Sequence, residues 1–117
     1  GPTGSHRYFV DARTLDVGAD GVVRYALVVK TAGGATHAGY EGIRCSTYEK
    51  RVYALGHPQR KWIEARRSVW EKIPRSHANE HHAVLYADYF CPDRRIVADR
   101  AAALRAFASG KYGSRAR

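Results

Sequence analysis

The chain has 117 residues, of which 44% are hydrophobic and 26% are charged. Its 20 Lys and Arg residues outnumber its 11 Asp and Glu residues, which gives a net charge of +9. This length predicts one domain and excludes a multidomain protein. No apolar run approaches the roughly 18 residues of a membrane-spanning helix, so the sequence predicts no transmembrane helix.

The first six residues, GPTGSH, resemble the remnant of a protease site and a cloning linker, and no initiator methionine is present. We therefore treat residues 1–6 as a cloning scar and expect one α+β domain over residues 7–110. A flexible basic tail is expected over residues 111–117. Any export signal would have been removed together with the natural N-terminus.

The segments that follow predict an antiparallel meander of strands. Residues 7–11 (RYFVD) read as a short strand, and residues 15–21 (LDVGADG) read as a turn-rich stretch that ends in a hairpin-type Asp-Gly pair. Residues 22–30 (VVRYALVVK) form the clearest strand, because apolar residues recur at every second position from Val23 to Val29. The paired glycines of residues 31–35 predict a turn.

Two further strands complete the expected meander. Residues 36–43 return antiparallel to the preceding strand, and residues 50–56 (KRVYALG) alternate again. The motif YEGIRC, residues 40–45, begins as a strand, and its Gly42 is expected to permit a bend.

Residues 57–74 hold both tryptophans of the chain, Trp62 and Trp70, between two prolines. Their pattern leaves three structures open: a short hairpin, an irregular loop packed on the sheet, and an amphipathic helix.

Two helices are predicted in the C-terminal part. Residues 77–91 predict a helix that ends before Pro92. Its expected buried stripe, at i, i+3, i+4 and i+7 spacing, consists of His82, Leu85, Tyr86 and Tyr89. Residues 99–110 predict a second helix with Asp99 as its N-cap and Gly110 after its last turn. Its expected buried stripe consists of Ala101, Leu104 and Ala108, with Phe107 alongside.

These elements indicate an α+β fold, in which an antiparallel β-meander is covered by two C-terminal helices. The two cysteines, Cys45 and Cys91, each end an apolar segment. They could form a disulfide, remain free thiols or bind a metal together, but their separation is unlike that of a C-x-x-C zinc or redox pair. We favour a disulfide that staples the sheet to the first helix. Such a bond would indicate an oxidising compartment and therefore export.

Several motifs together resemble one protein family. They are YFVD, DGVVRYALVV, YEGIRC, RVYALG, the pair of tryptophans and DYFCP. On these motifs the chain resembles the CNP-one-like (CNP1-like) family, a group of small proteobacterial proteins of uncharacterised function that are usually described as exported or as lipoproteins. The resemblance covers about residues 7–110. It implies a periplasmic domain that is often tethered through a lipidated N-terminal cysteine, and it supplies no catalytic residue.

The segment SHANEHH, residues 76–82, is a candidate metal site. His77 and His81 are four residues apart and would share one helix face, with Glu80 nearby. The zincin motif requires a glutamate directly after the first histidine, where this chain has Ala78, and no third ligand is evident. We therefore expect no bound metal and no cofactor, and interpret the segment as the polar start of a helix.

No catalytic signature is present either. The serines lie in no G-x-S-x-G context, and the glutamates show no spacing typical of a glycosidase pair. We therefore expect a protein that is not an enzyme.

The strongest functional signal is a basic and aromatic stretch. Residues 44–75 carry nine basic and three acidic side chains, net +6, whereas residues 1–43 carry four of each. The candidate anion-binding residues are Arg44, Arg60, Lys61, Trp62, Arg66, Arg67, Trp70 and Lys72. Arginine binds phosphate and carboxylate groups, and tryptophan stacks on sugars, bases or cations. In the structural alternative, both tryptophans belong to the core and the cations are solvated.

We therefore expect a periplasmic, non-catalytic binding or accessory domain of the bacterial envelope that recognises an anionic envelope component or an acidic protein. One alternative is a nucleic-acid-binding domain that uses the same basic patch inside the cell. A second alternative is a cryptic enzyme or metal binder that uses His77, Glu80 and His81.

Overall fold

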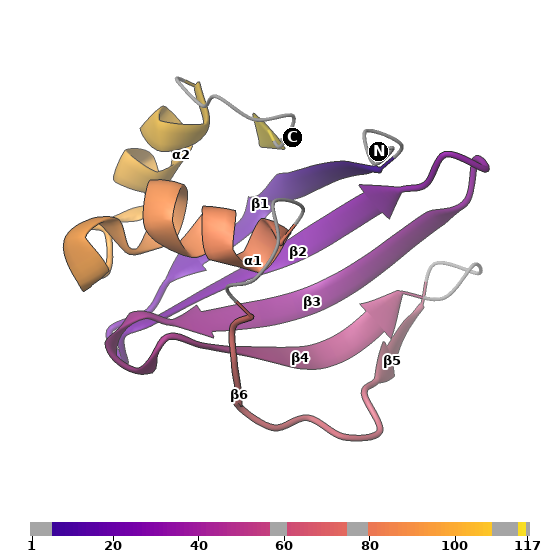
Figure 1. Ribbon diagram of the computed structural model, residues 1–117, viewed down its shortest axis with the longest axis horizontal. Coiled ribbons are helices and arrows are strands. Elements are labelled where there is room, and N and C mark those ends of the chain that lie inside the picture. The colour runs from indigo at the N-terminus through magenta and orange to yellow at the C-terminus, as the bar shows by residue number, and fades with distance from the viewer. Residues whose placement is uncertain (1–5, 57–60, 75–79, 109–114, 117) are drawn as a thin grey trace.

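The structure is a computed structural model that describes residues 6–56, 61–74, 80–108 and 115–116 (Figure 1). Within these residues, an antiparallel sheet is covered on one face by helical segments from the C-terminal part, which confirms the predicted fold class. No helix among them is long and apolar enough to cross a membrane.

The strands in chain order are β1 (Arg7–Val17), β2 (Val22–Lys30), β3 (Thr36–Arg44), β4 (Glu49–Gly56), β5 (Trp62–Glu64), β6 (Glu71–Lys72) and β7 (Arg115–Ala116). Across the sheet their order is β5-β4-β3-β2-β1-β7, and β6 also pairs with β4. The first four strands form the predicted antiparallel meander, whereas β7 lies parallel to β1. Two residues of the predicted tail therefore pair with the sheet.

β1 is longer than the sequence predicts, because it continues to Val17. A bulge interrupts its pairing with β2, and there the Thr14 hydroxyl oxygen accepts a hydrogen bond from the Ala26 backbone N–H at 2.8 Å. This side chain takes the place of a ladder partner, so the strand resumes after the bulge. The turn expected over residues 15–21 is therefore confined to residues 18–21.

Gly42 does not bend the chain, and the expectation of a bend is wrong. It lies inside β3, in register with Arg24 of β2 and Arg51 of β4. β4 carries one extra residue, Tyr53, at a bulge opposite β3, and a Cβ on Gly42 would come within 3.0 Å of the Tyr53 ring. The glycine therefore makes room for an aromatic ring that crosses the strand.

Residues 61–74 form an irregular edge of the sheet. β5 pairs with Ala54–Gly56 and β6 pairs with Glu49–Lys50, so both short strands lie against β4. Between them, the Ala65 backbone N–H donates to the Tyr53 carbonyl at 3.0 Å. The amphipathic-helix alternative is therefore wrong for these residues, and a loop packed on the sheet describes them best.

The helical layer begins with α1 (His81–Val84), which continues into the π-helical turn η3 (Leu85–Phe90) and then the 3₁₀ turn η4 (Pro92–Arg94). The Cys91 N–H donates to the Tyr86 carbonyl at 2.8 Å, the i to i+5 bond of a π-helix. The predicted helix over residues 77–91 is thus partly π-helical, and its first three residues lie outside the described part of the chain. The predicted stripe is confirmed, because all of its members are buried: His82, Leu85, Tyr86 and Tyr89.

The last helix, α2 (Arg100–Ala108), begins as predicted. The Asp99 carboxylate accepts a hydrogen bond from the Ala102 backbone N–H at 2.9 Å, which is an N-cap contact. Gly110, the predicted residue after its last turn, lies outside the described residues.

The buried face of α2 differs from the prediction. Ala103 and Phe107 are buried, whereas Ala101 and Ala108 are exposed and Leu104 is half-buried. Alanine occupies both faces of this helix, so the apolar pattern does not define which face turns inward. The packing of the Phe107 ring against Tyr89 determines which face of α2 is buried.

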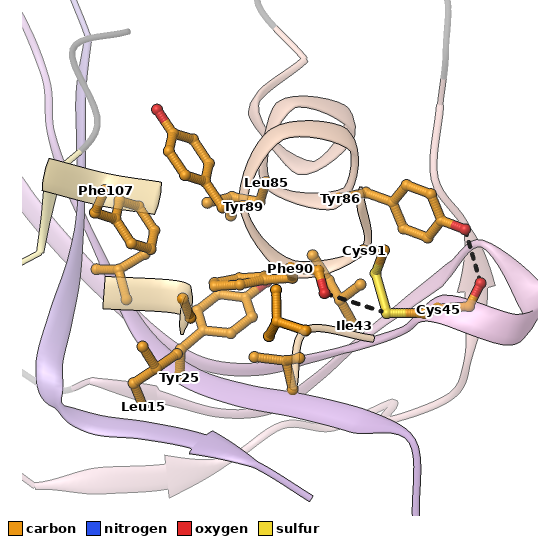
Figure 2. Packing of buried hydrophobic residues seen from close by; sticks show 14 of the residues in the cluster. Leu15, Tyr25, Ile43, Cys45, Leu85, Tyr86, Tyr89, Phe90, Cys91 and Phe107 are labelled. Carbon is orange, nitrogen blue, oxygen red and sulfur yellow. Dashed lines mark hydrogen bonds between the residues drawn. A yellow bond between two sulfur atoms is a disulfide. The ribbon is translucent and has the colours of Figure 1, made fainter. Parts of the chain in front are cut away.

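One hydrophobic core joins the sheet to the helical layer (Figure 2). Tyr25 of β2 packs against Phe90 with ring centroids 5.1 Å apart. Phe107 of α2 stacks on Tyr89 of η3 with ring centroids 4.3 Å apart and planes nearly parallel. Aromatic contacts therefore connect the two layers and fix α2 against η3.

The predicted disulfide between Cys45 and Cys91 is present. Cys45 begins the 3₁₀ turn η2 (Cys45–Thr47) after β3, and Cys91 follows η3, so the bond ties the sheet to the first helical element. Figure 2 shows the Tyr86 hydroxyl donating to the Cys45 carbonyl beside this bond, at 2.7 Å.

Candidate functional site

Aromatic rings and arginines gather on the sheet face opposite the helical layer. Residues alternate between the two faces of a strand, so Tyr40 and Arg44 of β3 point away from the core that Ile43 enters. We define the open-face strip as Tyr40, Tyr53, Trp62, Trp70, Arg24, Arg44 and Arg51. Its residues come from β2, β3, β4, β5 and the chain just before β6.

The four rings of the open-face strip form a continuous chain of contacts. Trp62 and Tyr40 have ring centroids 6.3 Å apart, and Tyr40 and Tyr53 have theirs 5.9 Å apart. Trp70 meets Tyr53 edge-on at 6.4 Å. Tilted and edge-to-face contacts of this kind are favourable for aromatic pairs, so each ring is held by its neighbour.

Guanidinium groups lie over two of these rings. Arg44 is 4.3 Å from the ring centroid of Trp70. Arg51 and Arg24 are 5.2 Å and 5.7 Å from that of Tyr53. Each cation–π contact contributes about 0.5–2 kcal/mol, depending on its exposure. Positive charge and aromatic surface are therefore interleaved along the strip.

Two of the arginines also have carboxylate partners. Arg24 Nη2 lies 2.7 Å from Asp20 Oδ2, and this hydrogen bond holds the pKa of Asp20 below its usual value. Arg44 Nη2 lies 2.6 Å from Glu49 Oε1. Hydrogen bonds from Thr47 and Arg44 lower the pKa of Glu49. These pairs orient the guanidinium groups while leaving parts of them exposed.

Arg51 differs from the other two arginines, because its Nε donates to the neutral Ser68 hydroxyl at 2.8 Å. No described carboxylate forms an ion pair with Arg51. Its charge is thus the least compensated of the three, which makes it the best-placed cation in the strip for an incoming anion.

The sequence-predicted anion-binding residues divide between the strip and its border. Arg44, Trp62 and Trp70 lie in the strip. Exposed side chains on the neighbouring edge of the sheet are Lys61, Arg66, Arg67 and Lys72. Lys61, Arg66 and Arg67 form no ion pair with any described carboxylate. Arg60 lies outside the described residues.

Neither tryptophan belongs to the core, so that part of the structural alternative is wrong. Trp62 is 51% exposed, and Trp70 is half-buried against arginines and Tyr53. Sequence reasoning missed the other strip residues, Arg24, Tyr40, Arg51 and Tyr53. Strand alternation could have placed Arg24 on this face, whereas the position of Tyr53 depends on a bulge with no local sequence signal.

A cleft of about 630 Å³ lies beside the disulfide and has a partly basic lining. Lys72 and Arg94 contribute to that lining, together with Tyr48 and Tyr86. The Lys72 ammonium donates to the Thr47 carbonyl at 2.7 Å, which directs this side chain to the cleft instead of the open-face strip. Lys72, which the sequence grouped with the anion-binding residues, therefore lies outside the open-face strip.

A separate polar network is buried beneath the helical layer. Glu41 of β3 is only 7% exposed. Its Oε1 accepts a hydrogen bond from the Tyr25 hydroxyl at 3.1 Å and lies 2.8 Å from His82 Nε2. Burial, reinforced by the nearby carboxylate, raises the pKa of Tyr25 well above its usual value, so this hydroxyl remains a donor.

The described part of the SHANEHH segment joins this network. Glu80 caps α1 by accepting a hydrogen bond from the His82 backbone N–H at 3.2 Å. His81 stacks on Tyr8 of β1 with ring centroids 4.2 Å apart. Burial, together with His82, lowers the pKa of His81 to about 4, so this imidazole is neutral at pH 7. His77 lies outside the described residues.

A family model matches residues 1–108, and that family is the CNP1-like family. The chain belongs to the CNP1-like family. The resemblance drawn from YEGIRC and DYFCP is therefore confirmed. In this CNP1-like domain the two motifs are the ends of β3 and η3 that the disulfide joins. No curated protein and no solved structure matches the chain significantly.

Proposed function

We propose that this CNP1-like domain is a non-catalytic binding or accessory module of the bacterial envelope that recognises an anionic partner. The open-face strip is its binding surface. The observation that carries this proposal is the continuous run of four aromatic rings with arginines lying over them.

The chemistry of the strip favours a ligand that carries both rings and negative charge. Exposed indole faces stack on sugar rings, and guanidinium groups bind phosphate or carboxylate through paired hydrogen bonds. An acidic glycan or the phosphorylated sugars of lipopolysaccharide present both groups. The exposed cations Lys61, Arg66 and Arg67 extend the positive surface beyond the rings, where they increase the rate of encounter with a polyanion.

A periplasmic location is part of the proposal. The disulfide supports it, since structural disulfides persist in oxidising compartments. A lipid tether before the present N-terminus, as the resemblance implies for many relatives, would hold the domain at the membrane surface.

Charge reversal tests the proposal. Arg66→Glu combined with Arg67→Glu should weaken binding to lipopolysaccharide or an acidic glycan by roughly 1–3 kcal/mol, about 5- to 150-fold, because charged hydrogen bonds are lost. The melting temperature should remain nearly unchanged, since exposed charges contribute little to folding. Affinity of the parent should also fall steeply with salt, because bound counterions are released.

The matched control changes the same net charge elsewhere. Arg94→Glu combined with Arg95→Glu alters an adjacent exposed pair in the helical layer and should weaken binding much less. Equal losses in both double variants would mean that net charge alone drives binding. Tight, salt-dependent binding to DNA or RNA with none to envelope polymers would instead favour the nucleic-acid alternative.

A further inference from the structure

The buried network around His82 has the arrangement of a metal site. The sequence argument against a metal rested on a missing third ligand after His81 and Glu80. The structure supplies that ligand, because one ligand atom each from Glu80, His81 and His82 lies within 4.8 Å of the other two. His77, the partner considered from sequence, is not needed for this set.

The two ring nitrogens of His82 face two different carboxylates. Nε2 lies 2.8 Å from Glu41 Oε1, an acceptor, so Nε2 is the ring nitrogen that donates. Nδ1 then presents its lone pair to Glu80 Oε1, 3.4 Å away. Glu80 Oε1 already accepts from the His82 backbone N–H at 3.2 Å, so a cation between Oε1 and Nδ1 would be its second partner.

The distance between these atoms is compatible with a shared cation. An N–H···O hydrogen bond is usually about 2.7–3.2 Å long, so 3.4 Å is outside that range. In a tetrahedral zinc site, bonds of about 2.0–2.2 Å place neighbouring ligand atoms about 3.3–3.6 Å apart. Glu80 and His82 therefore stand at the spacing that such an ion requires, and His81, whose ligand atom lies within 4.8 Å of theirs, would complete the set after a small side-chain shift.

Glu41 supplies the second feature of a metal site. A histidine that binds metal through one nitrogen usually donates its other N–H to a carboxylate, which fixes the orientation of the ring. Glu41 accepts from His82 in this way, and Tyr25 in turn holds Glu41. Stacking of His81 on Tyr8 restrains the third ligand.

The geometry points to a divalent transition-metal site, of the zinc type, with Glu80, His81 and His82 as ligands and Glu41 as the carboxylate that orients His82. The fourth position is open to water or to an anionic ligand. Lys50 is the nearby positive charge that opposes the ion, and the carboxylates of Glu41 and Glu80 offset it. This site lies on the opposite side of the sheet from the open-face strip and does not depend on the proposed binding function.

The test is titration of chelator-treated full chain with Zn²⁺ by calorimetry and with Co²⁺ by visible absorption. We expect one equivalent to bind, with the absorption of a tetrahedral or five-coordinate cobalt site. His81→Ala and Glu80→Gln should each remove that equivalent, while Glu41→Gln should lower the affinity by about 10- to 100-fold and leave the stoichiometry at one. Both cysteines are bridged, so no thiol competes for the ion.

His37→Ala is the matched control, because His37 is exposed and belongs to neither the proposed ligand set nor the Glu41 pair. This change should leave the affinity unaltered. Circular dichroism of each metal-free variant verifies the fold, and if His81→Ala does not fold, Glu80→Gln decides alone. Absence of saturable binding in the parent, or undiminished binding in a folded ligand variant, would overturn the assignment.

Discussion

Individual residues determine how the rings of the open-face strip are held. Tyr53 sits at a bulge of β4 and lies across Gly42, where the absence of a side chain leaves room for the ring. A Cβ at Gly42 would stand 3.0 Å from two Tyr53 atoms and 3.1 Å from Val22 Cγ1. This glycine is therefore a packing requirement of the strip.

Gly42→Ala should lower the free energy of unfolding by about 1–3 kcal/mol, because the new methyl group overpacks against Tyr53. Urea denaturation measures the change. Gly33→Ala is the control, since a Cβ there would meet no atom within 4 Å, and it should change stability by less than about 0.5 kcal/mol. Equal stabilities of the two variants would show that Tyr53 does not depend on Gly42.

The second prediction at the residue scale concerns pH. The pKa of His81 falls from 6.5 to about 4 on folding, so the unfolded chain binds more protons between these values. The free energy of unfolding should therefore decrease as pH falls from about 6.5 to about 4, by on the order of 2–3 kcal/mol from this group. Urea midpoints at pH 7 and pH 4.5, with a chelator present, measure it.

His81→Gln provides the comparison, because glutamine does not titrate. Its stability should decrease less over the same pH interval than that of the parent. The same pH dependence in both proteins would contradict the assigned role of His81.

Elements were predictable to different degrees. β2 and β3 follow from residues that alternate along the chain, and the N-cap of α2 follows from one aspartate, because these signals are local. The edge strands β5 and β6 and the π-helical turn η3 depend on pairing with β4 and on packing against the core, which adjacent residues do not encode. For the same reason, Trp62 and Trp70 were identified from sequence, whereas Tyr53 and Arg51, their neighbours across strands, were not.

The disulfide acts at the scale of elements, because it joins the end of β3 to the end of η3. Cys45→Ala and Cys91→Ala, alone or together, should each lower the free energy of unfolding by about 2–5 kcal/mol, since any of them opens the same loop. Guanidinium denaturation measures this loss. Two alkylatable thiols in the native parent, detected by intact mass, would contradict the bond and remove the support that it gives to export.

At the scale of the whole molecule, the two faces of the sheet carry different chemistry. The helical face holds the core and the buried Glu41–His82 network, and the opposite face holds the open-face strip. Of the described cations in residues 44–75, Arg44 and Arg51 lie in that strip, and Lys61, Arg66 and Arg67 lie on its border. This division is why a polyanion is expected on one face while a metal ion would bind on the other.

The central claim, that an anionic partner binds on the open-face strip, is tested most directly by tryptophan fluorescence. The chain has two tryptophans, and both lie in the strip. Trp70→Phe leaves Trp62, 51% exposed, as the sole reporter. Titration with lipopolysaccharide or an acidic glycan should shift its emission and shield it from acrylamide quenching. The dissociation constant from this fluorescence change should equal that measured by calorimetry. Binding detected by calorimetry with no change in Trp62 emission or shielding would place the partner elsewhere and contradict the account.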